Sequence, residues 1–374
     1  MIINVSRNDL YANVATLQNV TSKKGTIAIL ANILIETGSE SIILTATDLE
    51  VGIRIEIPAE ILTPGSITLP SRKFFEMIRE INDDHVHLEV FENKWVKIST
   101  SSGNYNIAGT DSEEYPSLPE FKKDILSSVA CDIIGEAIDK TQFSIAQEND
   151  NQFNLMGVLF EKETRDEKNY LRLVSSDGHR LSLFEREFDT DVTKLVVDHV
   201  ILIPKKGILE VRKLCDNNDF IEIGFENKQA IFKSDKTIII VRLLNGEFPN
   251  YRNIFKSINK NSSIEIDRVN FISSMKRINL FTEDLYNSVH FSFENEKLTL
   301  TSQNMDIGSA KEELSINYTG ETLNLGFNGK YFVESLQVMN SEKIKAYINT
   351  EKSPCLIEGD DDPGFMSIIM PMKI

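Results

Sequence analysis

The chain has few of the residues that build disulfide frameworks, metal sites or nucleotide-binding loops. Its three cysteines, Cys131, Cys215 and Cys355, are odd in number and far apart, with no C-x-x-C pair, which argues against a disulfide framework and a structural zinc site. No H-E-x-x-H or comparable set of ligands exists, and neither G-x-x-x-x-G-K-[ST] nor G-x-G-x-x-G occurs. We therefore expect no metal ligands, no nucleotide site and no cofactor.

Long hydrophobic runs are also missing. No window approaches the roughly 18 uninterrupted apolar residues of a membrane span. The first residues, MIINVSRNDL, lack the basic flank and apolar stretch of a secretion signal. Apolar residues make up 41% of the chain and charged residues 26%, as is typical of a soluble globular protein. These features predict a cytoplasmic protein that does not enter membranes.

Positive charge is scarce overall but unevenly placed. The 374 residues include 40 Lys and Arg against 57 Asp and Glu, a net charge of −17 that ordinarily argues against a nucleic-acid partner. Four segments with helical spacing nevertheless carry a net charge of +2 or +3, namely residues 7–24, 71–79, 204–213 and 268–277. The strands and loops are predicted to hold the acidic excess. For any one of these helices, a solvated face without a partner is the alternative reading.

Repetition is the main positive feature of the sequence. The stretches LPSRKFFEMIREI from Leu69, IPKKGILEVRKLC from Ile203 and FNGKYFVESLQVM from Phe327 resemble one another, with starts 134 and 124 residues apart. A second set, ATDLEVGIR, SSDGHRLSL and SQNMDIGSA, keeps a similar period. Self-similarity at a fixed period indicates one structural unit written three times.

Each unit is predicted to run helix, strands, helix, strands. Amphipathic segments open the units near residues 7–20, 132–145 and 268–281, the second of them net acidic. Between the helices lie alternating apolar runs that pair as hairpins across Glu-Asn turns. The predicted fold class is α+β, with three tandem copies of a domain that packs two helices against antiparallel sheets.

Proline-containing segments predict the domain boundaries. EYPSLPEF and EFPNYRNIF close the first two units, and Pro116 and Pro249 lie 133 residues apart. Proline fixes φ and has no backbone N–H to donate to a sheet, so it suits a segment that leaves one sheet and begins the next. We place the domains at residues 1–122, 123–254 and 255–374.

Two segments are candidates for a functional site. SDGHRL, from Ser176 to Leu181, gathers Ser, Asp, His and Arg, but neighbours on a strand point to opposite faces, so an Asp-Gly turn or a surface recognition patch is favoured over catalysis. The chain ends in the apolar SIIMPMKI, which should be docked rather than frayed. Its methionines could serve core packing or form an adaptable peptide-binding wall.

In order along the chain, TDLE, SRKFFE, SDGHRL, IPKKGI, GEFPNY and MPMKI resemble the motifs of the bacterial sliding clamp, the beta subunit of DNA polymerase III. The resemblance covers essentially all 374 residues. In that family two chains close head to tail into a ring, with helices toward a central hole and sheets that run across domain borders. The resemblance implies a homodimeric, non-enzymatic processivity factor that encircles duplex DNA without reading its sequence. It also implies a cleft between the second and third domains that binds the replicative polymerase, the clamp loader and other clamp-binding-motif proteins.

By matching positions, the resemblance implies two sets of site residues and no catalytic residue. DNA would contact Lys24, Arg72, Lys73, Lys205 and Lys206, although Lys24 stands where the family often has Arg. In the cleft, an extended peptide would lay apolar side chains among Leu, Pro and Met groups, while His179 and Arg180 would offer polar or charged contacts. The cleft residues are Leu155, Ser176, Gly178, His179, Arg180, Leu181, Pro249, Asn328, Tyr331, Met370, Pro371 and Met372.

Two other functions stay open at this point. One is a three-unit protein-interaction scaffold that never meets DNA, which the basic helices oppose. The other is a hydrolase that uses Asp177 and His179. A clamp predicts a dimer that stays on circular DNA and slides off a linear molecule, whereas a scaffold predicts neither behaviour.

Overall fold

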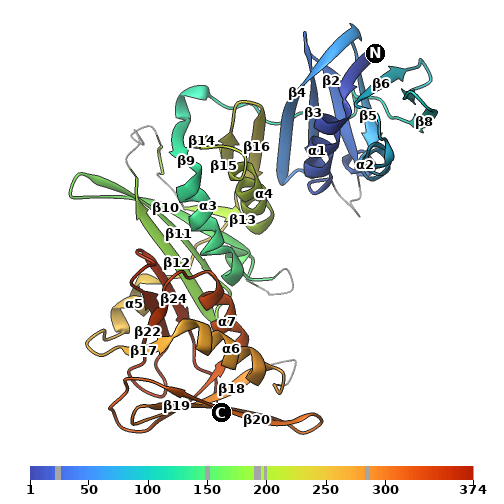
Figure 1. Ribbon diagram of the computed structural model, residues 1–374. Helices are drawn as coiled ribbons and strands as arrows, with labels where there is room; N and C mark the ends of the chain where they lie inside the picture. Colours follow the sequence, from blue (N-terminus) through green and yellow to red (C-terminus); the bar gives the residue numbers. More distant parts are fainter. Residues whose placement is uncertain (22–26, 148–151, 189–194, 198–199, 283–286, 374) are drawn as a thin grey trace. The chain divides into compact units, whose positions relative to one another are not determined.

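The computed structural model describes residues 1–21, 27–147, 152–188, 195–197, 200–282 and 287–373 (Figure 1). The chain forms two compact units, the first mainly Met1–Cys131 with Lys213–Leu243, the second mainly Asp132–Thr190 with Val197–Arg212 and Leu244–Ile374. The helices of the described residues are α1 (Arg7–Gln18), α2 (Ser71–Glu80), α3 (Cys131–Asp139), α4 (Lys205–Cys215), α5 (Arg252–Ser257), α6 (Arg268–Asn279) and α7 (Gly329–Gln337).

A twelve-stranded antiparallel sheet forms the centre of the first unit. Its main path is β8-β7-β6-β1-β4-β16-β15-β14-β9. A branch of three further strands begins at residues 52–58 of β4 and runs outward in the order β3, β2, β5. The strands are β1 (Ile2–Ser6), β2 (Asn32–Thr37), β3 (Ser41–Thr47), β4 (Val51–Thr63), β5 (Ser66–Pro70), β6 (His85–Val90), β7 (Trp95–Ser99), β8 (Asn104–Ala108), β9 (Ser127–Ala130), β14 (Phe220–Glu226), β15 (Gln229–Lys233) and β16 (Thr237–Arg242).

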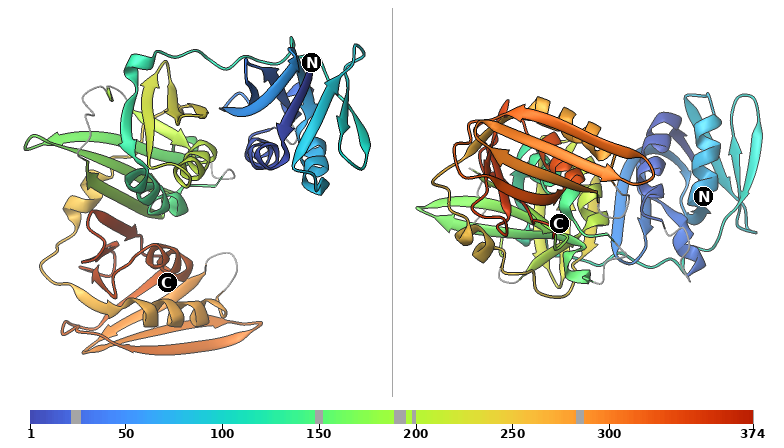
Figure 2. Two further views of the ribbon diagram at one scale, coloured as in Figure 1. Left: turned by 45° about the horizontal axis from the view of Figure 1, so that its top comes forward. Right: turned by 90° about the horizontal axis from the view of Figure 1, so that it is seen from below.

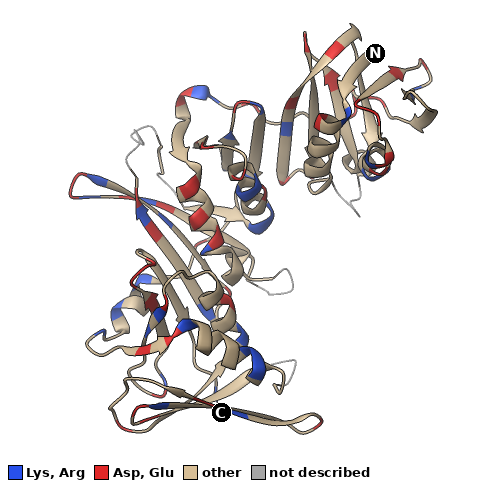
Figure 3. Cartoon of the chain, in the orientation of Figure 1, with Lys and Arg blue, Asp and Glu red and all other residues tan. Residues whose placement is uncertain are grey.

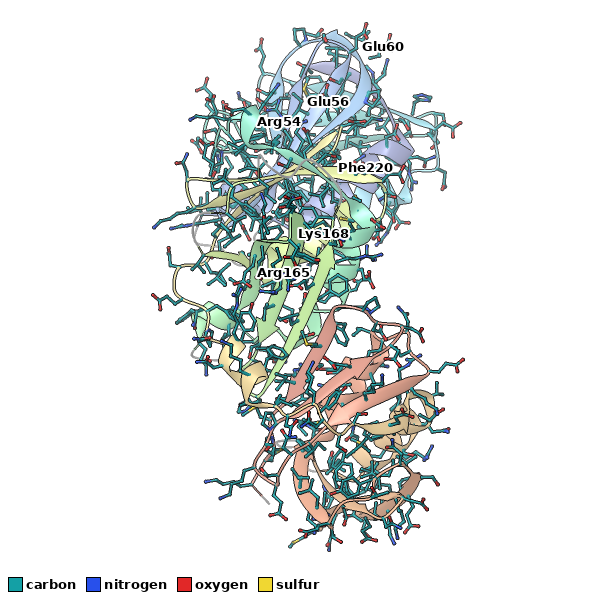
Figure 4. All side chains as sticks on the ribbon, turned by 90° about the vertical axis from the view of Figure 1, so that its left-hand side faces the viewer. Arg54, Glu56, Glu60, Arg165, Lys168 and Phe220 are labelled. Carbon is teal, nitrogen blue, oxygen red and sulfur yellow. The ribbon has the colours of Figure 1, made fainter. Side chains whose placement is uncertain are left out.

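Strand β4 shows why these residues form a sheet. Its isoleucines at 53, 55 and 57 are buried, whereas Arg54 and Glu56 between them are exposed, the alternation of a strand with one face in a core. Figure 4 shows Arg54, Glu56 and Glu60 projecting from this strand. One end of β4 pairs with β16, which lies about 180 residues later in the sequence. The pairing confirms that a sheet crosses from the first repeat into the second.

The second unit contains an eight-stranded and a four-stranded antiparallel sheet. Their orders are β13-β10-β11-β12-β24-β23-β22-β17 and β20-β19-β18-β21. The strands of the larger sheet are β10 (Gly157–Arg165), β11 (Lys168–Ser176), β12 (Arg180–Glu187), β13 (Ile201–Pro204), β17 (Ile264–Asp267), β22 (Lys343–Tyr347), β23 (Cys355–Gly359) and β24 (Phe365–Ile369). Those of the smaller sheet are β18 (Ser288–Glu294), β19 (Lys297–Asn304), β20 (Gly308–Ser315) and β21 (Leu323–Asn328).

Each of the three predicted repeats contains the same two strand-to-helix connections. β1, β9 and β17 lead without a loop into α1, α3 and α6, and β5, β13 and β21 lead in the same way into α2, α4 and α7. The first backbone N–H of each opening helix donates to a carbonyl that follows the second helix of its repeat. These bonds run from Arg7 to Asp84 (2.9 Å), from Cys131 to Asp219 (2.8 Å) and from Arg268 to Glu342 (2.9 Å). The α+β prediction is therefore confirmed.

The opening helix of the middle repeat is shorter than predicted. The sequence pattern indicated a helix to residue 145, but α3 ends at Asp139 and a 3₁₀ turn covers residues 142–144. The hydroxyl of Thr141 donates to the Ala137 carbonyl at 2.6 Å, and the Ser144 hydroxyl donates to the Thr141 carbonyl at 3.3 Å. Side-chain hydroxyls that bond to backbone carbonyls compete with the backbone hydrogen bonds of a helix. The α-helix therefore ends and a tighter 3₁₀ turn follows.

The predicted Glu-Asn hairpins are present, and one has the geometry that its sequence favours. Between β14 and β15 the turn residues Asn227 and Lys228 have φ values of 50° and 62°. Asparagine tolerates this left-handed region, and a two-residue turn of this kind matches the twist of paired strands.

A buried ion pair joins Lys140, the residue that follows α3, to the turn between β23 and β24. The ammonium of Lys140 lies 2.6 Å from Asp362 Oδ1, and their side chains are 3% and 0% exposed. Asp362 also accepts bonds from the backbone N–H groups of Asn340 and Ser341 and from the Ser341 hydroxyl. Burial alone would raise the pKa of Asp362, but these donors outweigh it and the pKa is lowered.

Candidate functional site

The SDGHRL segment forms a tight turn between β11 and β12. Asp177 Oδ1 accepts hydrogen bonds from the backbone N–H groups of His179 and Arg180, both at 3.0 Å, and Gly178 has a φ of 85°. The predicted Asp-Gly turn is therefore confirmed. Because the aspartate binds backbone groups and the Arg180 guanidinium, the described contacts do not form the Asp–His pair that a hydrolase would need.

The end of the chain lies against this turn. The Met370 N–H donates to the His179 carbonyl at 2.9 Å, and the Met372 N–H donates to the Gly326 carbonyl at 2.8 Å. The terminal segment thus leaves β24 of the larger sheet and reaches β21 of the smaller one. Pro371 lies between the two bonded residues and needs no acceptor. The apolar terminus is docked, as predicted.

Arg180 lies below the turn rather than on its surface. Its Nε donates to Asp177 at 2.9 Å, its Nη2 donates to the Phe143 carbonyl at 2.6 Å, and its Nη1 pairs with Glu334. The guanidinium stacks on the ring of Tyr331, 4.3 Å from the centroid, and the residue is 8% exposed. A buried guanidinium needs such partners, so Arg180 fixes the turn and Tyr331 on α7. This differs from the expectation that it offers its charge to a peptide.

The predicted leucines are buried. Leu155 is 1% exposed in a 3₁₀ turn, and Leu181 is 4% exposed within the apolar cluster of the larger sheet. Asn154 Nδ2 donates to the Glu247 carbonyl at 2.7 Å, which ties the 3₁₀ turn of Leu155 to the exposed segment that contains Pro249.

Most of the remaining predicted residues are exposed or half-buried. Gly178, His179, Pro249 and Met370 are exposed, whereas Asn328, Tyr331, Pro371 and Met372 are half-buried and Ser176 is buried. Asn328 caps α7 by accepting the Lys330 N–H at 3.0 Å.

A groove with a volume of about 1100 Å³ opens beside the SDGHRL turn and the terminal segment. It includes three predicted residues, His179, Pro371 and Met372, but most of its wall comes from β18, β19 and β20, which the sequence did not single out. The only signal in the sequence was the polar half of the alternating pattern on these strands. The groove is lined by His179, Ser288, His290, Thr301, Ser302, Gln303, Ser309, Ala310, Lys311, Pro371, Met372 and Lys373.

Four of the five predicted DNA-contacting residues lie in the first turns of α2 and α4. The side chains of Arg72 and Lys73 are 86% and 67% exposed, 3.0 and 3.9 Å from Glu76. Lys205 and Lys206 hold the equivalent place in the middle repeat. The helix dipole disfavours cations at this end, so helix stability does not explain them. Lys24 lies outside the described residues.

The basic helices contain cations with structural roles as well. Arg7 donates to the Ile78 and Arg79 carbonyls at the end of α2 (3.1 and 2.6 Å). Arg268 makes the equivalent bonds in the third repeat, to the carbonyls of Leu336 and Ser341. These arginines bond to carbonyls at the ends of α2 and α7 or just beyond them. The charge counts therefore overstate the number of cations available to a partner. Figure 3 also shows the carboxylates that α3 carries, as its sequence predicted.

Models of the N-terminal, central and C-terminal domains of the DNA polymerase III beta subunit match residues 1–119, 128–250 and 257–373. The chain belongs to this sliding-clamp family. The beta sliding clamp of Haemophilus influenzae is 28% identical, with the whole of both chains covered. That of Chlamydia trachomatis is also 28% identical, over 99% of this chain and 86% of the relative.

Solved sliding clamps share the fold over the full chain. A DNA polymerase III beta subunit from Eubacterium rectale is 26% identical with a TM-score of 0.89, and both chains are fully covered. A Bartonella birtlesii clamp bound to griselimycin is 24% identical with a TM-score of 0.92, again with both chains covered. This clamp-family chain therefore has three clamp domains.

In the part of the chain that the structure describes, no group of three or more His, Cys, Asp or Glu side chains could hold a metal ion. Among the same residues, no helix has the length and apolar character that crossing a membrane requires.

Proposed function

We propose that two copies of this chain close a ring around duplex DNA and tether replication proteins through the cleft beside the SDGHRL turn. The observation that carries the proposal is the joining of that turn, the terminal Met370–Met372 segment and the start of α7 by hydrogen bonds and ring stacking. The clamp-family membership supplies the rest of the argument. The ring would act in the cytoplasm, catalyse no reaction, and be built from domains at residues 1–122, 123–254 and 255–374.

The partners of the cleft would be short extended peptides of the replicative polymerase, the clamp loader and other clamp-binding proteins. Pro249, Met370, Pro371 and Met372 offer apolar groups beside the exposed His179 on a backbone fixed by Arg180. Rigid apolar anchors next to a few polar groups suit peptide recognition, because little ordering entropy is lost on binding. A related clamp, that of Bartonella birtlesii, has been solved with griselimycin bound.

The DNA contacts would be nonspecific and sensitive to salt. Arg72 and Lys73 are exposed, and with Lys205 and Lys206 they occupy equivalent first turns of two repeats, with Lys24 as a further contact. Cations on phosphates hold a duplex without reading bases. The chain as a whole carries a net charge of −17, so the acidic residues outside these helices would discourage binding of DNA from outside.

A head-to-tail homodimer would use the free sheet edges. Among the described strands, β8 pairs only with β7 and β20 pairs only with β19, so each presents an unpaired edge. An edge strand that pairs with another chain is no longer an aggregation site, so a ring closed through β8 and β20 would cover these two edges. The family pattern joins the first domain of one chain to the third domain of the other.

The test combines solution mass with retention on DNA. We expect a dimer of twice the 42.4 kDa chain mass, which a clamp loader places on nicked circular plasmid and which is released when the plasmid is cut. A Lys205→Glu, Lys206→Glu double variant should slide off faster or load poorly, whereas Lys345→Glu, an exchange on strand β22, should not. A monomer that is never retained on circular DNA would overturn the proposal.

The cleft has its own test. Removal of Met370 to Ile374 should abolish binding of a clamp-binding peptide while the dimer mass is unchanged. An unchanged peptide affinity would remove the terminal segment from the site.

A further inference from the structure

The groove extends well beyond the residues of the proposed cleft. Helix α6 packs on one face of the four-stranded sheet (Figure 2). On this face, Ser274 and Arg277 bond to Glu312 of β20. Strand alternation places His290, Thr301 and Lys311 on the opposite face, where they line the groove. We call this part of the groove, lined by β18, β19 and β20, the sheet arm.

The strand register sets the length of the sheet arm. Lys311 lies opposite Thr301, Thr301 opposite His290, His290 opposite Gly326, and Gly326 opposite Met372. Because Gly326 has no side chain, this line of paired residues leaves an open space between His290 and the terminal segment. Neighbouring strands lie about 4.8 Å apart, which gives about 19 Å from Met372 to Lys311. An extended peptide rises about 3.3 Å per residue, so about six residues would span the arm.

The chemistry of the lining is unusual for this chain. None of the lining residues is Asp or Glu, although the sequence contains 57 of them. The wall offers hydroxyl, amide and imidazole groups together with the ammonium groups of Lys311 and Lys373. Lys311 Nζ contacts Glu313 Oε1 at 2.7 Å, but both side chains are about half exposed. Such pairs contribute little, so the carboxylate of a ligand can take the place of Glu313.

The sheet arm is continuous with the proposed cleft, because His179, Pro371 and Met372 line both. We propose that the arm binds an acidic segment of about six residues that directly flanks the apolar anchor of a partner peptide. The inference rests on the proposed peptide-binding function and adds a partner chemistry to it. The flank would run across the sheet with its carboxylates near Lys311 and its polar groups on Thr301 and His290.

The test compares two fluorescent peptides on the full-length protein. Both carry the same apolar clamp-binding anchor, and one adds six residues that include three Asp or Glu. We expect the acidic flank to tighten binding about fivefold at low salt and the gain to vanish at high salt. Lys311→Glu should remove the gain and leave the affinity for the short peptide unchanged.

The matched control is Lys297→Glu. Lys297 lies on the same face of β19 but outside the groove, so a nonspecific charge effect would appear equally in both variants. Equal affinity for the two peptides, or an equal loss in both variants, would overturn the sheet-arm inference. If neither peptide binds, the proposed cleft function itself fails. A single-stranded oligonucleotide that displaces the acidic flank and loses affinity in Lys311→Glu would assign the arm to nucleic acid instead.

Discussion

Replacement of Asp362 by Asn should destabilise the second unit strongly. The exchange keeps the size of the side chain but removes the charge that faces the Lys140 ammonium at 2.6 Å, between side chains that are 3% and 0% exposed. Loss of one partner of a buried ion pair leaves the other charge uncompensated, at a cost of about 3–5 kcal/mol. For a unit of this size, a loss of about 3 kcal/mol lowers the melting temperature by about 6–12 °C.

Hydrogen–deuterium exchange during thermal unfolding would measure this loss in peptides from α3 and β24. The matched control is Asp360→Asn, since Asp360 lies in the same turn but pairs with Lys345 at the surface and its side chain is 78% exposed. That control should change stability by less than about 1 kcal/mol. A Lys140→Met, Asp362→Leu double variant should recover part of the loss, because an apolar pair carries no desolvation penalty.

The same variant has a pH signature. The pKa of Asp362 is lowered in the folded state, so its contribution is present above the ordinary carboxyl pKa of about 3.9 and is lost as pH falls through the lowered value. The Asp362→Asn variant should therefore lose less stability than the wild type as the pH falls through this range. Wild-type exchange protection in Asp362→Asn, with an unchanged acid profile, would refute the reasoning.

Three further predictions concern single side chains. Burial raises the pKa of Tyr115 to about 12, so its stabilisation is present below pH of about 10 and is lost as pH rises toward 12; Tyr115→Phe should flatten that alkaline loss in a denaturation series. Gly364 has a φ of 81° and an added Cβ would lie 1.8 Å from the Glu185 carbonyl oxygen, so Gly364→Ala should cost at least about 2 kcal/mol in urea unfolding. Arg180→Met should weaken binding of a clamp-binding peptide about tenfold in a titration, because Tyr331 loses the cation on its ring; wild-type affinity would contradict this role.

The sequence predicted the repeats well because their signals are local. Helices α1 and α6 begin at the residues where the amphipathic pattern begins, and the Asn227 hairpin has the turn geometry that its residues favour. The end of α3 was missed, because the choice of Thr141 to bond back to the Ala137 carbonyl depends on the packing around it. Local pattern predicts which elements form and predicts their ends less well.

The candidate site was predicted in part for a related reason. The turn at Asp177 and the docking of the terminal segment follow from residues adjacent in sequence, and the structure has both. The burial of Arg180 could not be predicted, because its partner Glu334 lies 154 positions away. The sheet arm depends on the register of three strands and on the Gly326–Met372 bridge, none of which a one-dimensional pattern fixes.

The middle repeat divides its strands between two sheets. β9 and β14 to β16 extend the sheet of the first repeat, whereas β10 to β13 join strands of the third. The boundaries of the sequence repeats therefore do not coincide with the boundaries of the hydrogen-bonded sheets. A single repeat on its own would expose unpaired edges of β4, β16, β12 or β24. Such edges can pair nonspecifically with strands of other chains. Deletion of one repeat would therefore leave unpaired strands rather than a smaller complete fold, so the three repeats depend on one another.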